Sequence, residues 1–418
     1  IIETHLHADH VSGNTDLQAM TGADIYIHES AGVEFEFKPL KEGDVLSLGN
    51  VQLAARFTPG HTPESISLLV TDLTRAKEPW MALTGDTLFV GDIGRPDLIG
   101  LEAARALADQ MYDTIHQEIL PLPDGVMVFP GHGAGSLCGK SIGAVRSTTI
   151  GFERHNNPAL FPRERVDFVD FAVAELPEQP ANVKRIKAMN RRGPRPLGEI
   201  EPRPIIIQDS ISFFQRGAAL LDLRLKDAYK ARHIPGSVHL DLDDQLSNRI
   251  GFVLSPDVPV ILMLPGQTSE EIASEYVQVI YALARVGYDA VAGYLAESLD
   301  VWEAYGLPLT SGDVQDIEPK ELHKLLESGN GDTPIVLDVR EPWEFAQGHV
   351  PGAELIPLGE LIQRVGELEQ GRPVAVICET GSRSQSAAAL LGREGFETIY
   401  NVLGGTSGWK RDGLPIVR

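Results

Sequence analysis

Histidine and aspartate residues gather in a short segment near the start of the sequence. Within Thr4–His10 the candidate metal ligands are His5, His7, Asp9 and His10. Three imidazoles this close together would repel one another if protonated, whereas neutral histidines can bind a divalent metal ion. The spacing therefore predicts a metal site.

Three further residues of ligand type follow along the chain, each in a turn that contains glycine. They are His61 in Thr-Pro-Gly-His-Thr, Asp86 in Thr-Gly-Asp after the apolar strand Trp80–Leu83, and His132 in Phe-Pro-Gly-His-Gly. Loops at strand ends allow ligands from distant parts of a sequence to converge. We expect these three residues to join the first four.

A second chemical signal is the cysteine Cys378, which follows the predicted strand Pro373–Ile377. The sequence Cys-Glu-Thr-Gly-Ser-Arg-Ser then leads into a predicted amphipathic helix, Gln385–Glu394. Turning backbone N–H groups, a helix N-terminus and the positive charge of Arg383 all stabilise a thiolate. Cys378 is therefore predicted to be a nucleophile.

The elements that position Cys378 occur twice. The segment from Leu220 is similar to the segment from Ile335, and Asp222 recurs as Asp338 at an offset of 116 residues that the neighbouring matches share. In both copies strands alternate with helices, which predicts a parallel sheet with helices on both faces. Leu264 stands in the first copy where Cys378 stands in the second, and residues 206–312 contain no cysteine.

Composition limits the possible partners. Lys and Arg number 36 against 59 Asp and Glu, which gives a net charge of −23 and argues against nucleic acid. Apolar runs such as Val260–Leu264 are too short to cross a membrane. Two cysteines exclude a disulfide framework and favour a reducing, cytoplasmic setting. The basic, proline-rich stretch 177–204 is expected to be an extended linker. Oligomeric state stays open, with a homo-oligomer as one option.

The His-x-His-x-Asp-His motif followed by His61, Asp86 and His132 resembles the metallo-β-lactamase superfamily. This resemblance implies an α/β fold for residues 1–205, a four-layered αββα sandwich with metal at the sheet edges. Members of the superfamily normally have strands before the motif. Because the sequence begins at Ile1, we expect an N-terminal piece to be missing.

The repeat resembles rhodanese domains through Asp338-x-Arg340 and the Gly348–Ala353 segment. It implies two doubly wound parallel α/β domains, a degenerate one at 206–312 and a catalytic one at 313–418. In the second, Cys378 would take up a sulfane sulfur as a persulfide, with Arg383 beside it. The Cys-to-Arg loop is one residue shorter than in the related phosphatases, which favours sulfur over phosphate.

Two subgroups of the superfamily are close to this sequence. Persulfide dioxygenases bind one Fe(II), which implies His5, His61 and Asp86 as the iron ligands here. Glyoxalase II-type hydrolases bind two Zn ions with all seven ligands, so His7, Asp9, His10 and His132 would either surround the iron or hold a second metal. The seven ligands leave this choice open.

Other segments favour the dioxygenase. The segments Gly91–Asp97, Glu153–Pro158 and 172–183 resemble persulfide dioxygenases. Arg95 and Asp97 are predicted to support the active site. Cys138 lies between glycines soon after His132, and we weigh a contact with the substrate persulfide against a purely structural role.

Together the two resemblances imply a non-haem iron persulfide dioxygenase fused to a sulfurtransferase that acts in sulfide detoxification. A low-molecular-weight thiol persulfide would react with dioxygen to give sulfite and thiol. Cys378 would pass sulfane sulfur to sulfite, giving thiosulfate, or run the reverse step. The alternatives are a dinuclear zinc thioester hydrolase fused to rhodanese modules and a non-enzymatic sulfur carrier or sensor.

Overall fold

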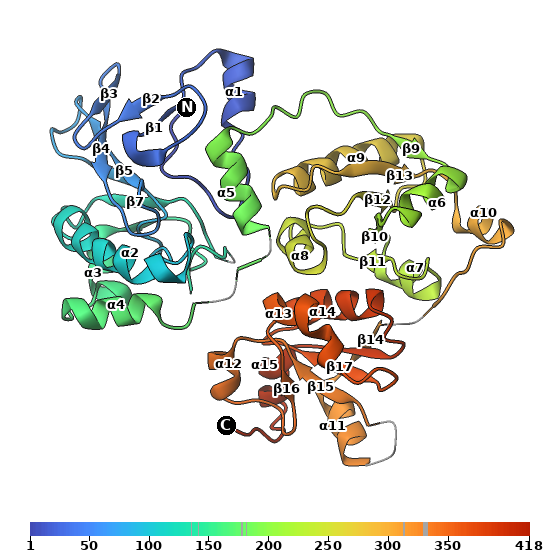
Figure 1. The fold of residues 1–418 in the computed structure, drawn as a ribbon. Coiled ribbons are helices and arrows are strands. Elements are labelled where there is room, and N and C mark those ends of the chain that lie inside the picture. The colour runs from blue at the N-terminus through green and yellow to red at the C-terminus, as the bar shows by residue number, and fades with distance from the viewer. Residues whose placement is uncertain (135, 141, 177–178, 181, 312–313, 329–332) are drawn as a thin grey trace. The chain divides into compact units, whose positions relative to one another are not determined.

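The computed structural model describes residues 1–418 apart from 135, 141, 177–178, 181, 312–313 and 329–332. The chain forms two compact units, one of residues 1–177 with 183–198 and one of residues 178–182 with 199–418. Figure 1 shows both units. The expected junction between the two repeat copies, at 312 and 313, lies outside the described residues.

The N-terminal unit is built on a six-stranded sheet and a small two-stranded parallel sheet. The strands of the large sheet, in spatial order, are β3 (Val45–Leu48), β4 (Val51–Phe57), β5 (Ile66–Asp72), β6 (Met81–Gly85), β7 (Met127–Pro130) and β8 (Thr148–Thr149). The small sheet pairs β1 (Tyr26–His28) with β2 (Lys38–Leu40). The predicted strand Trp80–Leu83 is observed as β6.

Helices of this unit bury an apolar core against the large sheet. They are α2 (Leu101–Thr114), α3 (Ile150–Asn156) and α4 (Arg165–Val173), with α1 (Asn14–Thr21) near the start of the chain. Met111 of α2 and Phe168 of α4 are each 1% exposed and pack with Ala82 of β6 and Val128 of β7. This core fixes the strand ends from which the histidine and aspartate side chains project.

The expectation of an extended linker at 177–204 is wrong for its central part, which forms helix α5 (Val183–Arg192). Val183, Ile186 and Asn190 are buried along it. A spacing of three and four residues places these side chains on one helical face. The basic residues of this stretch lie at other positions of the helix.

The C-terminal unit contains two five-stranded parallel sheets with the same strand order. The first copy has β9 (Pro204–Ile205), β10 (Ala219–Asp222), β11 (Val238–His239), β12 (Val260–Met263) and β13 (Val291–Leu295), in the order β11-β10-β12-β13-β9. The second copy has β14 (Val314–Ile317), β15 (Ile335–Asp338), β16 (Glu354–Leu355), β17 (Val374–Ile377) and β18 (Ile399–Val402), in the order β16-β15-β17-β18-β14. The copies therefore share one topology, as the repeat predicts.

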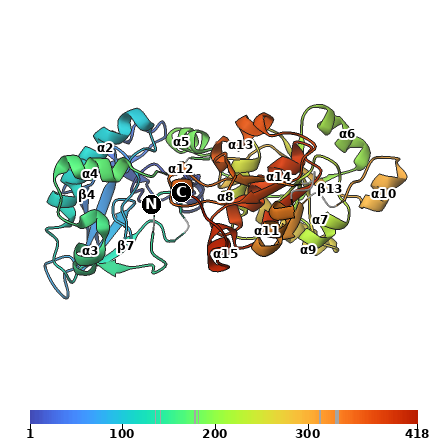
Figure 2. The same ribbon diagram turned by 90° about the horizontal axis from the view of Figure 1, so that it is seen from below.

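Each parallel sheet is accompanied by its own helices. Those of the first copy are α6 (Ile207–Gln215), α7 (Lys226–Ala231), α8 (Leu246–Val253), α9 (Ser269–Ala284) and α10 (Leu299–Ala304). Those of the second are α11 (Pro319–Ser328), α12 (Pro342–Ala346), α13 (Leu358–Arg364), α14 (Ser382–Arg393) and α15 (Gly405–Arg411). The predicted helix 385–394 is observed as α14, which packs against α8 of the first copy (Figure 2).

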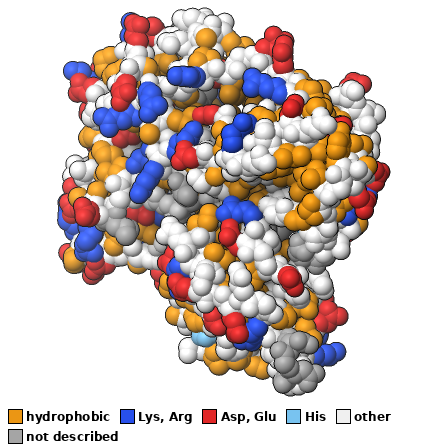
Figure 3. All heavy atoms as spheres, turned by 45° about the vertical axis from the view of Figure 1, so that its right-hand side comes forward, with side chains coloured by type: hydrophobic (Ala, Val, Ile, Leu, Met, Phe, Trp, Pro, Cys, Tyr) orange, Lys and Arg blue, Asp and Glu red, His pale blue; other side chains and the backbone are white. Residues whose placement is uncertain are grey.

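Short irregular helices complete the described secondary structure, at Glu29–Ala31, Ile115–Ile119, Pro158–Leu160 and Val365–Glu367. Among the described residues, no helix has the length and apolar character needed to cross a membrane. On the face drawn in Figure 3, basic and acidic side chains are interspersed.

Candidate active sites

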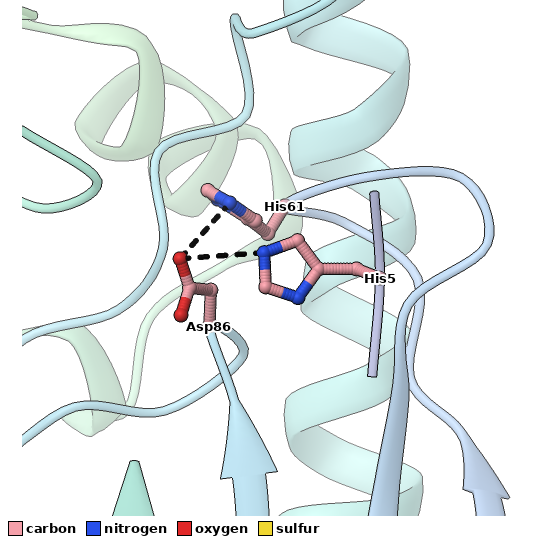
Figure 4. Close-up of side chains that lie close together, drawn as sticks. All are labelled: His5, His61 and Asp86. Carbon is pink, nitrogen blue, oxygen red and sulfur yellow. Dashed lines mark ion pairs between the residues drawn. The ribbon is translucent and has the colours of Figure 1, made fainter. Parts of the chain in front are cut away.

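Three side chains from separate segments meet at the ends of strands in the N-terminal unit. His5 follows Thr4, whose carbonyl accepts a hydrogen bond from Ile66 of β5 at 2.9 Å. His61 lies in the turn between β4 and β5, and Asp86 directly follows β6. All three are buried, at 1%, 0% and 2% exposure. Figure 4 shows both imidazole rings turned toward Asp86.

Two buried ring nitrogens of this cluster lack a hydrogen-bond partner among the described residues. Nδ1 of His61 lies 2.9 Å from the carbonyl oxygen of Arg95, an acceptor, so Nδ1 carries the proton. In the neutral ring Nε2 then carries a lone pair, and it lies 3.3 Å from Oδ2 of Asp86. The Nε2 atom of His5 lies 3.5 Å from the same oxygen. Neither Nε2 atom has a hydrogen-bond partner among the described residues.

A divalent cation fits these three residues. Buried lone pairs that face one another cost free energy unless a positive charge lies between them. Burial raises the pKa of Asp86, but His5 and His132 outweigh this effect and hold it well below its ordinary value. The carboxylate is therefore ionised at neutral pH, as a metal ligand must be. The donor atoms of His5, His61 and Asp86 all lie within 4.8 Å of one another.

His132 joins this cluster to Asp9. Its Nδ1 lies 2.8 Å from Oδ1 of Asp86, and its Nε2 lies 2.7 Å from Oδ2 of Asp9. Burial lowers the pKa of His132, but the two carboxylates outweigh burial and raise it to about 10. In this arrangement His132 is an imidazolium that orients Asp86.

The other histidines of the motif lie beside the cluster. His7 Nε2 is 3.5 Å from Oε2 of Glu3, and His10 Nδ1 is 3.0 Å from Oδ1 of Asp9. Burial and the neighbouring His5 lower the pKa of His7 to about 4, so its ring is neutral at pH 7. The ligand-type atoms of His7, Asp9 and His10 also lie within 4.8 Å of one another. These residues could hold a second metal ion.

Arg95 and Asp97 form a buried ion pair that supports His61. The guanidinium donates to both carboxylate oxygens of Asp97 at 2.7 Å, and the two residues are 3% and 5% exposed. The carbonyl of Arg95 is the acceptor that orients His61. Gly94, which precedes Arg95, packs so closely that a Cβ atom there would collide with the backbone oxygen of Asp86 and the ring of His61.

Cys138 lies beside the same centre. It is 2% exposed, and its sulfur lies within 4.8 Å of ligand-type atoms of Asp9 and His132. Burial and the charges of Asp86 and Asp9 raise the pKa of its thiol, which is therefore neutral at pH 7. Its carbonyl accepts a hydrogen bond from the Arg95 backbone at 2.9 Å, which ties the two segments together.

Two segments that resembled persulfide dioxygenases are hydrogen-bonded to each other. Oε2 of Glu153 accepts from the Gly91 backbone at 2.8 Å and from Asn157 Nδ2 at 2.9 Å. Asn157 Nδ2 also donates to the Asp92 carbonyl at 3.0 Å. Glu153 and Asn157 are both fully buried. These bonds hold the loop that carries Arg95.

The second candidate site surrounds Cys378 at the carboxyl end of β17. Cys378 is 1% exposed, and the Gly381 N–H donates to its sulfur at 3.1 Å. The Thr406 N–H donates to its carbonyl at 2.7 Å. Gly405, at φ +55°, is required beneath the loop because a Cβ atom there would collide with that carbonyl. The sulfur thus lies where α14 begins, as the sequence predicts.

Arg383, predicted as a positive charge beside Cys378, forms an ion pair with Glu344. Its guanidinium donates to both carboxylate oxygens of Glu344 at 2.7 Å. Arg340 donates to Asp338 and to Glu379 in a similar way, at 2.8 and 3.0 Å. Carboxylates therefore balance both cations near Cys378.

Family models match most of this chain. The metallo-beta-lactamase superfamily model matches residues 1–132, and the rhodanese-like domain model matches twice, at 211–305 and 318–412. The chain belongs to both families. It consists of a metallo-β-lactamase domain followed by two rhodanese-like domains, as the sequence motifs predict.

Curated relatives match either part. A probable metallo-hydrolase, YqgX, of Bacillus subtilis is 33% identical over 153 residues, 32% of this chain and 67% of the relative. A mitochondrial persulfide dioxygenase, ETHE1, of Bos taurus is 29% identical over 160 residues, 38% of this chain and 55% of the relative. A sulfurtransferase of Allochromatium vinosum is 35% identical over 104 residues, 25% of this chain and 95% of the relative. The chain thus spans about half the length of that persulfide dioxygenase.

Among solved structures, a metallo-beta-lactamase from Staphylococcus aureus superposes with a TM-score of 0.61 at 32% identity. The match covers 70% of this chain and 83% of that structure. It therefore extends beyond the metallo-β-lactamase domain into the rhodanese-like part.

In the degenerate rhodanese-like domain, glutamate side chains accept hydrogen bonds from the backbone of the loop that corresponds to the Cys378 loop. After β12 the chain continues with Leu264, and the Gly266 N–H donates to Oε2 of Glu275 at 2.8 Å. The N–H groups of Gln267 and Thr268 both donate to Oε2 of Glu271 at 2.9 Å. Backbone donors of the kind that face a reactive sulfur are therefore occupied here.

Sequence reasoning missed three polar residues that support the metal centre. Asn190 of α5 donates to the carbonyls of His7 and His10 at 2.9 and 2.8 Å. Oε1 of Glu64 accepts from the Leu6 N–H at 2.9 Å. Glu3 contacts His7, as described above. Of these three residues only Asn190 had a signal in the sequence, because it follows Val183 and Ile186 at helical spacing.

Proposed function

We propose that the metallo-β-lactamase domain is a persulfide dioxygenase with a single Fe(II) held by His5, His61 and Asp86, and that Cys378 carries sulfane sulfur. One observation carries the first half. Nε2 of His61 lies 3.3 Å from Oδ2 of the ionised Asp86 carboxylate inside the protein, and a metal ion would accept both atoms as ligands. Two histidines and one carboxylate are the ligand set of many non-haem iron oxygenases.

When bound, the iron supplies open coordination positions at which a persulfide and dioxygen can meet. The surrounding residues keep the ligands in place. The Arg95 carbonyl fixes the tautomer of His61, and His132 holds the Asp86 carboxylate. Cys138 presents a neutral thiol beside the centre, and we assign it a contact with the substrate sulfur.

The overall reaction consumes one persulfide, one dioxygen and one water, and yields one thiol, one sulfite and two protons. The outer sulfur is oxidised to sulfite while dioxygen is reduced. At the second site the Cys378 thiolate attacks the outer sulfur of a donor and becomes a persulfide. Sulfite then attacks that sulfur, so thiosulfate leaves and the thiolate is regenerated. The same steps run in reverse from thiosulfate.

Fusion of the two activities raises the effective concentration of a shared intermediate. This rationale supports a role in sulfide detoxification, in which sulfite made at one site is consumed at the other. The thiol that carries the persulfide stays open, and glutathione persulfide is a suitable probe.

The two halves are tested by separate variants of the full chain. His61→Ala should abolish oxygen uptake with glutathione persulfide and keep sulfur transfer from thiosulfate to cyanide. Cys378→Ser should do the reverse. His155→Ala alters an exposed histidine on α3 and serves as the control. Full oxygen uptake by the His61 variant would refute the iron assignment.

A second candidate is supported by two observations, the relative named as a probable metallo-hydrolase and the proximity of His7, Asp9 and His10. Two zinc ions at such a site would activate a water molecule for hydrolysis. Hydrolysis of a glutathione thioester by the zinc-loaded protein, together with absent oxygen uptake by the iron-loaded protein, would favour this alternative.

A further inference from the structure

A chain of hydrogen bonds leads from the Cys378 sulfur into the sheet of the second rhodanese-like domain. The sulfur lies 3.6 Å from Oγ of Ser384, and that oxygen lies 2.7 Å from Oδ1 of Asn401. Nδ2 of Asn401 donates to Oδ1 of Asp316 at 3.0 Å. Ser384 and Asn401 are 0% and 4% exposed, so water does not compete strongly for these bonds.

The far end of this hydrogen-bond chain, Asp316, contacts the degenerate domain, which belongs to the same compact unit. Nζ of Lys226 lies 2.7 Å from both carboxylate oxygens of Asp316, and Nζ of Lys230 lies 3.5 Å from one of them. The sequence of residues 206–312 contains no other lysine. Both lysines of the cysteine-free domain are therefore directed at one carboxylate of the catalytic domain.

The ionised carboxylate fixes the direction of every bond in the chain. A carboxylate only accepts, so Asn401 must present its amide nitrogen to Asp316 and its oxygen to Ser384. Ser384 donates its one proton to that oxygen or to the Gly381 carbonyl, 3.0 Å away. Its lone pairs are left facing Cys378. In this arrangement Ser384 can accept from a thiol but cannot donate to a thiolate.

We propose that Asp316 sets the direction of this chain and so favours the thiol over the thiolate at Cys378, with Lys226 and Lys230 holding Asp316 in place. Ser384, Asn401 and Asp316 are positioning residues. The degenerate domain thus restrains the sulfur carrier of its neighbour. The inference rests on the proposed role of Cys378, but its test measures the thiol itself and does not depend on sulfur transfer.

The charged groups near Asp316 and near Cys378 are consistent with an ionised Asp316 at one end of the hydrogen-bond chain. Burial raises the pKa of Asp316, but the hydrogen bonds from Lys226 and Asn401 outweigh burial and hold it below its ordinary value. Asp316 is therefore ionised at neutral pH. The charged groups around the cysteine loop are Arg340, Glu341, Glu344, Glu379 and Arg383. The variants below change none of them.

The central test is the rate at which iodoacetamide alkylates Cys378 in the full chain, read by mass spectrometry of the cysteine peptide. In Asp316→Asn the new amide can donate to Asn401, which lets Asn401 turn its nitrogen to Ser384 and lets Ser384 donate to sulfur. We expect about tenfold faster alkylation at about pH 7, the effect of one hydrogen bond gained by a charged group. The excess should shrink as the pH is raised, because a higher pH favours the thiolate in every variant.

Asp412→Asn is the matched control. Asp412 pairs with Lys320 at 3.9 Å on the same domain and takes no part in the chain. We expect wild-type alkylation from this variant. If Asp316→Asn and Asp412→Asn accelerated alkylation equally, loss of any acidic side chain would explain the effect, and the proposal would be overturned.

Two further comparisons identify the route. In a Ser384→Ala background, Asp316→Asn should not change the alkylation rate of Cys378. A full tenfold acceleration there would show that the effect does not pass through Ser384 and would refute the proposed hydrogen-bond route. Replacing both lysines, Lys226→Met with Lys230→Met, should accelerate alkylation in the same direction. Lys226→Arg keeps the charge and should keep the wild-type rate. An unchanged rate in the double lysine variant would overturn the role of the degenerate domain.

Discussion

The buried pair of Arg95 and Asp97 offers a sharp test of how the metal centre is supported. Asp97→Asn keeps the shape of the side chain and removes its charge, which leaves the guanidinium of Arg95 buried without the carboxylate that it contacts twice at 2.7 Å. Removing one partner of a buried ion pair costs about 3–5 kcal/mol. Because about 1.4 kcal/mol corresponds to a factor of ten, the loop should open at least about a hundredfold more often.

Hydrogen exchange followed by mass spectrometry measures this opening directly in the full chain. Peptides from residues 87–100 should exchange at least about a hundredfold faster in Asp97→Asn, whereas peptides of the rhodanese-like domains should be unchanged. Since Arg95 also orients His61, affinity for the metal should fall by about ten- to a hundredfold.

The control is a surface pair on the same domain. Arg105 and Asp170 lie 2.8 Å apart but are 59% and 60% exposed. Exposed pairs contribute about 0–1 kcal/mol, so Asp170→Asn should change exchange by no more than about fivefold. If Asp97→Asn behaved like Asp170→Asn, burial would not decide the strength of the pair, and the account of how His61 is supported would be refuted.

Three further predictions follow from the two sites. His61→Ala should lower bound iron to a small fraction of wild type in elemental analysis, and a wild-type iron content would remove His61 from the ligand set. Cys378→Ser should abolish persulfide formation on the protein after thiosulfate treatment while iron content stays at one per chain; labelled sulfur retained on the variant would place the carrier elsewhere. Burial raises the pKa of Glu344, but Arg383 outweighs burial and lowers this pKa below 4.5. The ion pair therefore stabilises the fold above about pH 4.5, the pKa of the unfolded chain. This stabilisation is lost as the pH falls through the lower pKa of the folded protein. Acid unfolding of Glu344→Gln should lack this component, and identical acid transitions in variant and wild type would contradict it.

The sequence predicted the parts of the fold that depend on local patterns. The strands β6 and β17 and the helix α14 formed near their predicted bounds, because apolar runs and glycine turns mark such elements. The two family matches confirm the domain types. The helix α5 was missed since its many basic residues obscured three buried positions on one face.

Contacts between distant residues could not be read from motifs. The motif placed His5, His61 and Asp86 together by resemblance, but Glu64 and Asn190 reach the same segment only through the folded backbone. Arg383 was predicted as a positive charge beside Cys378, and only the structure shows Glu344 balancing it. Such pairings depend on tertiary packing, for which one sequence carries no local signal.

The metal content of the purified protein distinguishes a mononuclear iron site from a dinuclear zinc site. The protein should be isolated from cells supplied with both iron and zinc, and its metals should be counted by elemental analysis. We expect one iron per chain, with little zinc, bound by His5, His61 and Asp86. Two zinc ions per chain would contradict this expectation and would make these three residues part of a dinuclear hydrolytic centre.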